Sequence, residues 1–285
     1  MVQGQALVLG GGGVAGIAWM TGLLTGLADA GQDVTGADMI IGTSAGATVT
    51  AQVGSGLPLD ALFARQVDPA LQAREIAAKL DLDKVAADWA ELMAGATSPQ
   101  DALRRVGAYA LAADTVPEAE RRAVIESRLP SHDWPARLIV LVAVETQTGA
   151  AVEFDSRSGV GLVDAVAASC AVPGVWPPVT IDGRRYIDGG VRSSDNADLA
   201  AGSERIVVIS PLGFDSPIQS PAPLRDVIAG LRAGGAEVTV LVPDQASVDA
   251  ISDNPLDPGT RAPAAEAGRA QGRAGLPDPA SQEPR

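Results

Sequence analysis

A short apolar strand that ends in Gly-x-Ser-x-Gly constrains this chain more than any other stretch. Ile40-Ile41 leads into Gly42-Thr43-Ser44-Ala45-Gly46, and small residues continue beyond it. A strand that turns sharply into a helix in this way exposes the serine hydroxyl, and glycines flank the serine because larger side chains would clash there. The stretch predicts an α/β fold and a nucleophilic Ser44. The alternative is an ordinary helix N-cap, in which Ser44 binds an amide of the first turn.

Composition narrows the choice of fold and of partner. Hydrophobic residues make up 46% of the 285 positions but aromatic residues only 3%, so the core must be built from Ala, Val, Leu and Ile. Such a core favours parallel strands packed against helices over an aromatic-rich β sandwich. The formal net charge is −14 and no basic run occurs. This argues against nucleic acid as a partner, because phosphate binding needs clustered Lys and Arg.

The single cysteine, Cys170, and the lack of long apolar segments bear on location. One cysteine excludes an internal disulfide and a cysteine metal cluster, and we expect a small buried core residue in a reducing compartment, the cytoplasm. No window approaches the about 18 consecutive apolar residues of a transmembrane helix, and residues 1–5 lack the basic start of a signal peptide. We therefore expect any membrane contact to be transient and confined to a local surface patch.

Strands and helices alternate from the start of the chain. Residues 6–9 predict a buried strand, residues 10–13 a glycine loop, and the apolar spacing from Ile17 a helix that ends at Gly31. A second strand is expected over residues 38–41 and a second helix over residues 45–53. Further strands are predicted at residues 137–144, 151–154, 184–187, 205–209 and 237–242, and further helices at residues 161–171 and 224–233.

Two segments depart from this alternation. Residues 58–130 have a helical pattern throughout, and we interpret them as an insertion that serves as scaffold; the alternative is that some of these helices line a substrate pocket. From residue 255 onward Pro, Gly, Ala, Arg and Glu dominate and large apolar residues are few. The sequence therefore predicts one folded domain over residues 1–254 and a disordered tail over residues 255–285, in which only residues 262–270 have a weak helical pattern.

A nucleophilic serine requires a base, and most serine hydrolases use a histidine. The one histidine, His132, lies in a proline-flanked loop, and none follows Asp188 in the order that an α/β-hydrolase triad needs. Asp188 is the better candidate, because it ends a predicted strand and Gly189-Gly190 lets the chain turn beside it. A carboxylate must be sheltered from water to act as an efficient base. The alternative is a plain turn at Asp-Gly-Gly.

The glycines that follow the first strand have two interpretations. Gly11-x-Gly13-x-x-Gly16 matches the spacing of a dinucleotide-binding loop. That loop should be accompanied by an acidic residue at the end of the second strand, where this chain has Gly42-Thr43-Ser44 instead. Consecutive amides at a helix N-terminus also bind a negative oxygen. We therefore assign the amides of Gly11, Gly12 and Gly13 to an oxyanion hole.

Together these motifs resemble those of the patatin-like phospholipase family. The glycine loop, the Gly-x-Ser-x-Gly stretch and Asp-Gly-Gly occur in the family's order, and the resemblance covers residues 5–250. Ala15 departs from it, because many members carry Arg or Lys there; this weighs against a phospholipid preference more than against ester hydrolysis. The matching segments are residues 11–16, 42–46, 168–174, 177–179, 188–190 and 196–198.

The resemblance implies a three-layer α/β/α fold with a mostly parallel central sheet and a helical insertion. It also implies a dyad in which Ser44 is the nucleophile and Asp188 accepts its proton, with no metal or cofactor. The substrates would be lipid carboxylic esters, as for a phospholipase A, a lysophospholipase or an acylglycerol lipase in lipid degradation. The alternatives are a soluble short-chain esterase or thioesterase, a non-catalytic regulatory protein on this fold and, more remotely, a nucleotide-binding protein. The motif glycines are Gly16, Gly42, Gly46, Gly189 and Gly190.

Overall fold

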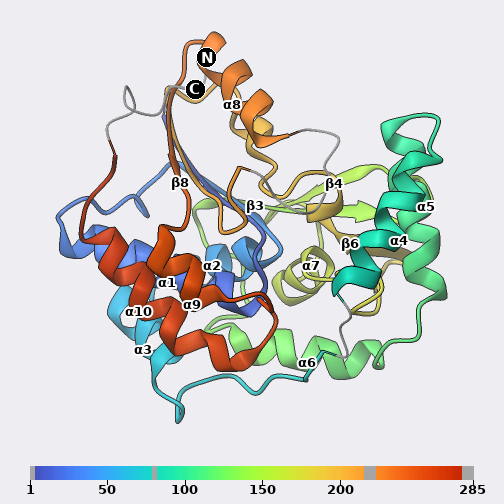
Figure 1. The fold of residues 1–285 in the computed structure, drawn as a ribbon, viewed down its shortest axis with the longest axis horizontal. Coiled ribbons are helices and arrows are strands. Elements are labelled where there is room, and N and C mark those ends of the chain that lie inside the picture. Colours follow the sequence, from blue (N-terminus) through green and yellow to red (C-terminus); the bar gives the residue numbers. More distant parts are fainter. Residues whose placement is uncertain (1–3, 79–81, 215–222, 278–285) are drawn as a thin grey trace.

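Five parallel and three antiparallel strands form one sheet in the computed structural model, which describes residues 4–78, 82–214 and 223–277. The sheet has the order β5-β6-β3-β2-β1-β7-β8, and β4 pairs with β3 (Figure 1). The mostly parallel sheet predicted from the sequence is confirmed. The parallel strands are β1 (Gln5–Leu9), β2 (Met39–Thr43), β3 (Leu138–Glu145), β7 (Arg205–Ile209) and β8 (Glu237–Leu241); the antiparallel ones are β4 (Ala151–Phe154), β5 (Val179–Ile181) and β6 (Arg184–Asp188).

Both faces of the sheet are buried, in alternation along each parallel strand. Leu7 and Leu9 of β1 belong to the core on one face, whereas Ala6 and Val8 belong to the core on the other. Successive side chains of a strand point to opposite faces. A strand covered on both sides therefore consists of an unbroken apolar run, which explains why these strands were recognisable from the sequence.

Helices cover the two faces and complete the three layers (Figure 1). The face of Leu7 and Leu9 carries α1 (Gly13–Asp29), α2 (Ala45–Gly54), α6 (Glu118–Arg128), α7 (Leu162–Ser169) and α10 (Arg261–Gly272). The opposite face carries the 3-10 helix η2 (Ala197–Ala200) and α8 (Leu224–Ala233). The outer helices α3 (Leu59–Val67) and α9 (Gln245–Ile251) pack against α10 and α1.

The predicted helical insertion comprises α3, α4 (Leu82–Ala94), α5 (Pro99–Ala112) and α6 within the described residues, and residues 68–78 form an irregular segment between α3 and α4. Helix starts follow the prolines, as expected. Ser98 Oγ accepts a hydrogen bond from Asp101 N at 3.1 Å, and Pro99 occupies the first helical position. Helices α4 and α5 share a core with the ends of β3 and β6.

The C-terminal segment departs most from the sequence prediction. The expected disorder is wrong for residues 255–277, because η3 (Pro258–Thr260) leads into α10, which packs along α1 (Figure 1). Small residues make this contact where large apolar ones were expected to be necessary. Ala264 and Ala265 are fully buried, and glycines in both helices let the two backbones approach closely. Residues 278–285 lie outside the described residues.

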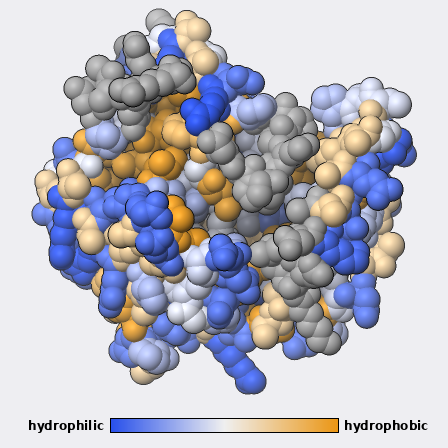
Figure 2. All heavy atoms as spheres, viewed as in Figure 1, coloured by the Kyte–Doolittle hydropathy of each residue, from blue (hydrophilic) through white to orange (hydrophobic). Residues whose placement is uncertain are grey.

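Charged side chains lie on the outer side of this helix pair. Arg269 of α10 and Arg273, which follows the helix directly, both bind Asp29 at the end of α1, at 2.8 Å and 2.9 Å. On the face shown in Figure 2, hydrophilic residues cover much of the surface over α3 and α10, and hydrophobic residues gather beside β8. Helix α10 therefore meets water through charged residues and α1 through small ones.

Candidate active site

Ser44 lies on the turn between β2 and α2, at the carboxyl end of the parallel strands. Its backbone has φ 55° and ψ −115°, a conformation that residues other than glycine rarely adopt. The turn is tight, because a Cβ on Gly46 would overlap the carbonyl oxygen of Leu9 and one on Gly42 would lie 2.6 Å from Thr50 Oγ1. This is the strand-turn-helix geometry that Gly-x-Ser-x-Gly predicts.

Three hydrogen bonds hold the Ser44 turn. Ser44 N donates to Ser169 Oγ at 3.0 Å, Cys170 Sγ donates to Ser44 O at 3.1 Å, and Gly46 N donates to Gly10 O at 3.0 Å. Burial raises the pKa of the Cys170 thiol to about 11, so the thiol remains a protonated donor and is not a reactive thiolate. Ser169 lies in the matching segment 168–174, but the sequence does not indicate its contact with the Ser44 turn, because α7 meets that turn only through the tertiary fold.

Strand β3 brings Asp188 to the same point, because it pairs with both β2 and β6. Thr43, the last residue of β2, and Asp188, the last residue of β6, lie opposite the consecutive residues Val142 and Ala143. The Asp188 carboxyl also caps the following 3-10 helix η1 (Gly189–Val191), since its Oδ1 accepts from Gly190 N at 2.7 Å. The register of β3 thus places two residues far apart in sequence at one edge of the sheet.

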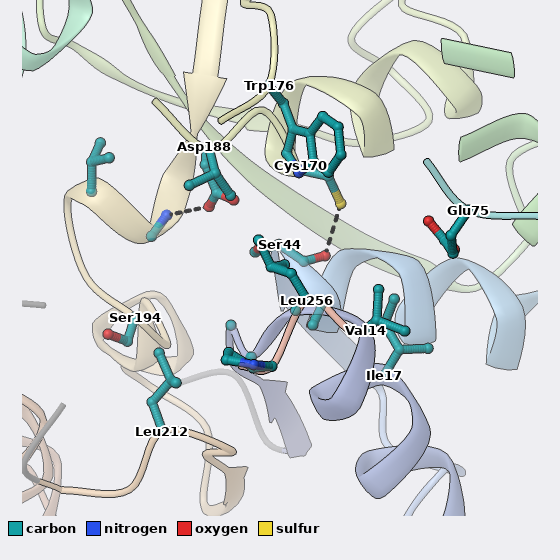
Figure 3. Close-up of a pocket in the computed structure, with 18 of the residues that line it drawn as sticks. Val14, Ile17, Ser44, Glu75, Cys170, Trp176, Asp188, Ser194, Leu212 and Leu256 are labelled. Carbon is teal, nitrogen blue, oxygen red and sulfur yellow. Dashed lines mark hydrogen bonds between the residues drawn. The ribbon is translucent and has the colours of Figure 1, made fainter. Parts of the chain in front are cut away.

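Ser44 and the buried Asp188 carboxyl line the same pocket (Figure 3). Burial raises the pKa of Asp188 to about 7, while the nearby Ser44 hydroxyl and the Gly190 amide act in the opposite direction. Asp188 Oδ2 has no partner in hydrogen-bond geometry among the described residues. A desolvated carboxylate with one unpaired oxygen is a stronger proton acceptor than an exposed one. A hydroxyl and a carboxylate arranged in this way can exchange a proton.

The glycine loop ends at the N-terminus of α1. Gly11 N donates to Ser194 O at 2.8 Å, so this expected oxyanion donor is already engaged. Within the described chain the amides of Gly12 and Gly13 have no backbone acceptor, and neither α1 nor α2 has a side-chain cap. Free amides at a helix N-terminus favour negative charge. The backbone amides of Gly12 and Gly13 are therefore the remaining candidate donors to an oxyanion. Ala45, at the start of α2, lines the same pocket.

The C-terminal segment packs directly against this glycine loop. Pro255 O accepts a hydrogen bond from Ala15 N at 2.9 Å, and a Cβ on Gly13, whose φ is 64°, would lie 2.6 Å from the same oxygen. Leu256 lines the pocket (Figure 3). Residues that the sequence assigned to a disordered tail therefore help to shape the candidate oxyanion site.

Asn196 links the serine turn to the Asp-Gly-Gly loop. Its buried Nδ2 donates to Thr43 Oγ1 at 3.0 Å and to Gly189 O at 3.2 Å. Arg192 Nη1 donates to Asn196 Oδ1 at 2.6 Å, which orients the amide. The Asn-containing loop picked out by resemblance thus connects the residues that precede Ser44 and follow Asp188.

Apolar side chains form most of the remaining wall of the pocket. Trp89 comes from α4 and Ile76 from the irregular segment before it, so the helical insertion lines the pocket and is not scaffold alone. Trp176 is buried and lines the pocket as well. A wall of this kind suits an acyl chain. The apolar lining residues are Val14, Ile17, Ile76, Trp89, Val172, Trp176, Val191, Leu212 and Leu256.

The one histidine lies away from this site. The His132 side chain is half exposed, contacts Glu126 and does not line the pocket. No group of three or more His, Cys, Asp or Glu side chains among the described residues is placed to hold a metal ion.

None of the helices in the described part of the chain is long and apolar enough to cross a membrane.

A family model described as patatin-like phospholipase matches residues 7–201. The chain belongs to the patatin-like phospholipase family. The match runs from β1 through η2, so it includes the glycine loop, Ser44 and Asp188, whereas β7, β8 and α10 lie beyond it. No curated protein matches the chain in sequence.

Two solved structures resemble this patatin-like chain at low identity. VipD from Legionella pneumophila is 12% identical with a TM-score of 0.45, and the alignment covers 95% of this chain and 66% of that one. The type III effector protein ExoU is 14% identical with a TM-score of 0.38, and the alignment covers 96% of this chain and 54% of that one. The patatin-like chain thus spans less than two thirds of the length of either.

Proposed function

We propose that this chain hydrolyses carboxylic esters of lipids with a Ser44–Asp188 dyad. The observation that carries the proposal is the buried Asp188 carboxyl, with an unpaired oxygen, in the same pocket as the strained Ser44 turn. Burial makes Asp188 basic enough to serve without a histidine. The apolar lining supports an acyl chain as the group bound next to the dyad.

Acylation begins when Ser44 Oγ attacks the ester carbonyl carbon and its proton moves to Asp188 Oδ2. The carbonyl electron pair moves onto oxygen, and the amides of Gly12, Gly13 and Ala45 bind the resulting oxyanion. When the intermediate collapses, the bond to the alkoxide oxygen breaks and Asp188 returns its proton to that oxygen. The products are the free alcohol and an acyl ester of Ser44.

Deacylation repeats these steps with water. A water molecule attacks the acyl carbonyl carbon while Asp188 accepts its proton, and the same amides bind the second oxyanion. Collapse breaks the bond to Ser44 Oγ, which regains its proton from Asp188. The carboxylic acid leaves and the dyad is restored, so no redox agent or further reactant is required.

A panel of esters tests this function against the Ser44→Ala variant. We expect the wild type to react with a fluorophosphonate probe and to hydrolyse lysophosphatidylcholine, monoacylglycerol or phosphatidylcholine, and Ser44→Ala to do neither while keeping its circular dichroism spectrum. Hydrolysis of p-nitrophenyl butyrate or an acyl thioester without any long-chain lipid would identify a short-chain esterase or thioesterase. A folded wild type that neither reacts with the probe nor hydrolyses any ester would instead be a non-catalytic member of the fold.

The pH dependence of hydrolysis should follow the ionisation of Asp188. Burial raises the pKa of this carboxyl to about 7, and only the ionised form accepts the serine proton. We expect kcat/KM to rise about tenfold per pH unit below pH 7 and to level off above it. A pH–rate profile from pH 5 to 9 measures this, and the inflection should persist in Asp195→Asn. A rate that is constant down to pH 5 would be inconsistent with a raised pKa at the base.

A further inference from the structure

A buried cluster of charged side chains lies at the pocket that contains Ser44 and Asp188, and three of its members, Glu75, Arg121 and Arg128, line that pocket. Arg128 donates two hydrogen bonds to Glu75, from Nε to Oε1 at 2.8 Å and from Nη2 to Oε2 at 2.6 Å. Arg261 Nη2 donates to the same Oε1, and Arg121 Nη1 lies 3.6 Å from Oε2. All four side chains are between 3% and 8% exposed, so the cluster is shielded from water.

The charges in this cluster do not balance. Three guanidinium groups face one carboxylate, and that carboxylate is already held by Arg128 and Arg261. A buried charge is costly unless it is paired and hydrogen-bonded. The cluster therefore favours the arrival of a further anion.

Arg121 is the member with the poorest pairing. Its Nε and Nη1 have no hydrogen-bond partner among the described residues, and its guanidinium stacks on Trp176 with Cζ 3.8 Å from the ring centroid. Burial and then the charge of Arg128 lower the pKa of Arg121 to about 9, so it remains cationic at neutral pH. Arg128 lies seven positions further along α6, two turns away on the same face. Arg121, Arg128 and Trp176 all line the pocket.

We propose that Arg121 and Arg128 form a subsite for an anionic oxygen group, a phosphate or a carboxylate, carried by the acyl ester that the dyad cleaves. The proposal rests on the proposed function, because it assigns the substrate class of the same pocket. A guanidinium presents donors in a planar fork that matches both phosphate and carboxylate oxygens. Glu75 and Arg261 then hold the subsite in place, while Arg121 supplies the donors and charge that the protein leaves incompletely paired.

Matched ester pairs test the subsite in the full chain. Mono-p-nitrophenyl glutarate and p-nitrophenyl valerate differ by a carboxylate, and a lysophosphatidic acid and a monoacylglycerol of equal chain length differ by a phosphate. We expect kcat/KM to favour one of the anionic members by about tenfold or more, the effect of a hydrogen bond to a charged group. Arg121→Gln should abolish this preference, so that the kcat/KM values of the anionic and neutral members of each pair come within about threefold of each other, since the charged contact is lost.

Two further variants separate charge from folding. Arg121→Lys keeps the cation and should keep part of the preference, which supports the subsite even if Arg121→Gln does not fold. Arg122→Gln is the matched control, because Arg122 neighbours Arg121 on α6 but pairs with Asp164 at 2.6 Å and lies outside the pocket. It should behave as the wild type. Equal turnover of neutral and anionic esters by the wild type would refute the subsite and leave the proposed function intact.

Binding to the Ser44→Ala variant distinguishes the two proposals when no ester is hydrolysed. Dodecyl phosphate or laurate should raise the melting temperature of Ser44→Ala, and the shift should disappear when Arg121→Gln is added. Dodecanol should give the same small shift in melting temperature with and without the Arg121→Gln substitution. Whichever of dodecyl phosphate and laurate gives the larger shift carries the preferred group, phosphate or carboxylate. Equal shifts with all three ligands, or shifts that survive Arg121→Gln, would overturn the subsite.

Discussion

Asp188→Asn is expected to lower kcat by about 10³-fold without unfolding the protein. The amide has the size of the carboxyl and can still accept the hydrogen bond that Gly190 N makes to Oδ1 at 2.7 Å. The amide cannot accept the proton of Ser44, because a neutral amide is not a base near neutral pH. Steady-state hydrolysis of a lipid ester at equal concentrations of folded wild type and variant measures the loss.

Asp195→Asn provides a matched control. Asp195 is also buried, and burial raises its pKa to about 7, opposed by a hydrogen bond to Ser210. Its carboxyl lies against Gly10 but does not line the pocket. We expect the kcat of Asp195→Asn to stay within about threefold of the wild-type value, because a carboxyl that does not line the pocket takes no part in the proton transfer from Ser44. Equal losses in the two variants would remove Asp188 from its assigned role.

The melting temperature of both variants supplies a test of folding. The pKa of each carboxyl is about 7 in the folded protein, against 3.8 for an aspartate exposed to water in an unfolded chain. A carboxyl whose pKa is raised by folding destabilises the folded state progressively as the pH rises through that window. An amide in its place removes this effect. Both variants should therefore melt at or above the wild-type temperature at pH 8, and Asp188→Asn should be inactive despite this.

Local patterns were sufficient to predict the parts of the fold that depend on neighbours in sequence. The unbroken apolar runs of β1, β2 and β3 follow from burial of both faces. The strained turn at Ser44 follows from glycines on either side of it, which the structure shows to be sterically required. Nothing local, however, places Asp188 beside Ser44. Asp188 was the better candidate base because it ends a predicted strand beside Gly189-Gly190, and the family resemblance then implied the dyad. The register of β3 against both β2 and β6 is what brings the two residues to one edge of the sheet.

Contacts that join distant segments could not be predicted from the sequence. Gly11 belongs to the glycine motif, yet its amide is occupied by Ser194 O, a contact that only the folded loop reveals. Ser169 and Pro255 act on the serine turn and the glycine loop from α7 and from the C-terminal segment. The arginine cluster likewise combines α6, the segment before α4, and α10. The sequence around each of these residues does not indicate which distant residue it contacts.

The prediction of disorder was wrong for residues 255–277, and the reason for the error suggests an experiment. It assumed that burial requires large apolar residues, whereas α1 and α10 meet through glycines on each helix. A Cβ on Gly22 would overlap the carbonyl oxygen of Ala265, and one on Gly268 would overlap that of Trp19. Close backbone packing of this kind gains dispersion contacts along the whole helix pair. A single added methyl group should therefore be more damaging here than its size suggests.

Gly268→Ala is accordingly expected to destabilise the protein by about 3 kcal/mol, which lowers Tm by about 10 °C. The added methyl cannot be accommodated by a side-chain rotation, because the atom it meets belongs to the backbone of α1. Chemical and thermal denaturation measure the change. Because Pro255 and Leu256 precede α10 and border the glycine loop, ester hydrolysis should be lost at a correspondingly lower temperature.

Gly230→Ala in α8 is the matched control, since it makes the same chemical change in another helix. Gly230 is exposed, and a Cβ there would have no atom within 4 Å. Alanine favours a helix over glycine by up to about 1 kcal/mol, so this variant should be as stable as the wild type or more stable. Opposite signs for the two variants would establish that α10 belongs to the folded domain. If both variants melted at the wild-type temperature, the α1–α10 contact would contribute nothing to stability. That result would agree with the disordered tail that the composition predicts.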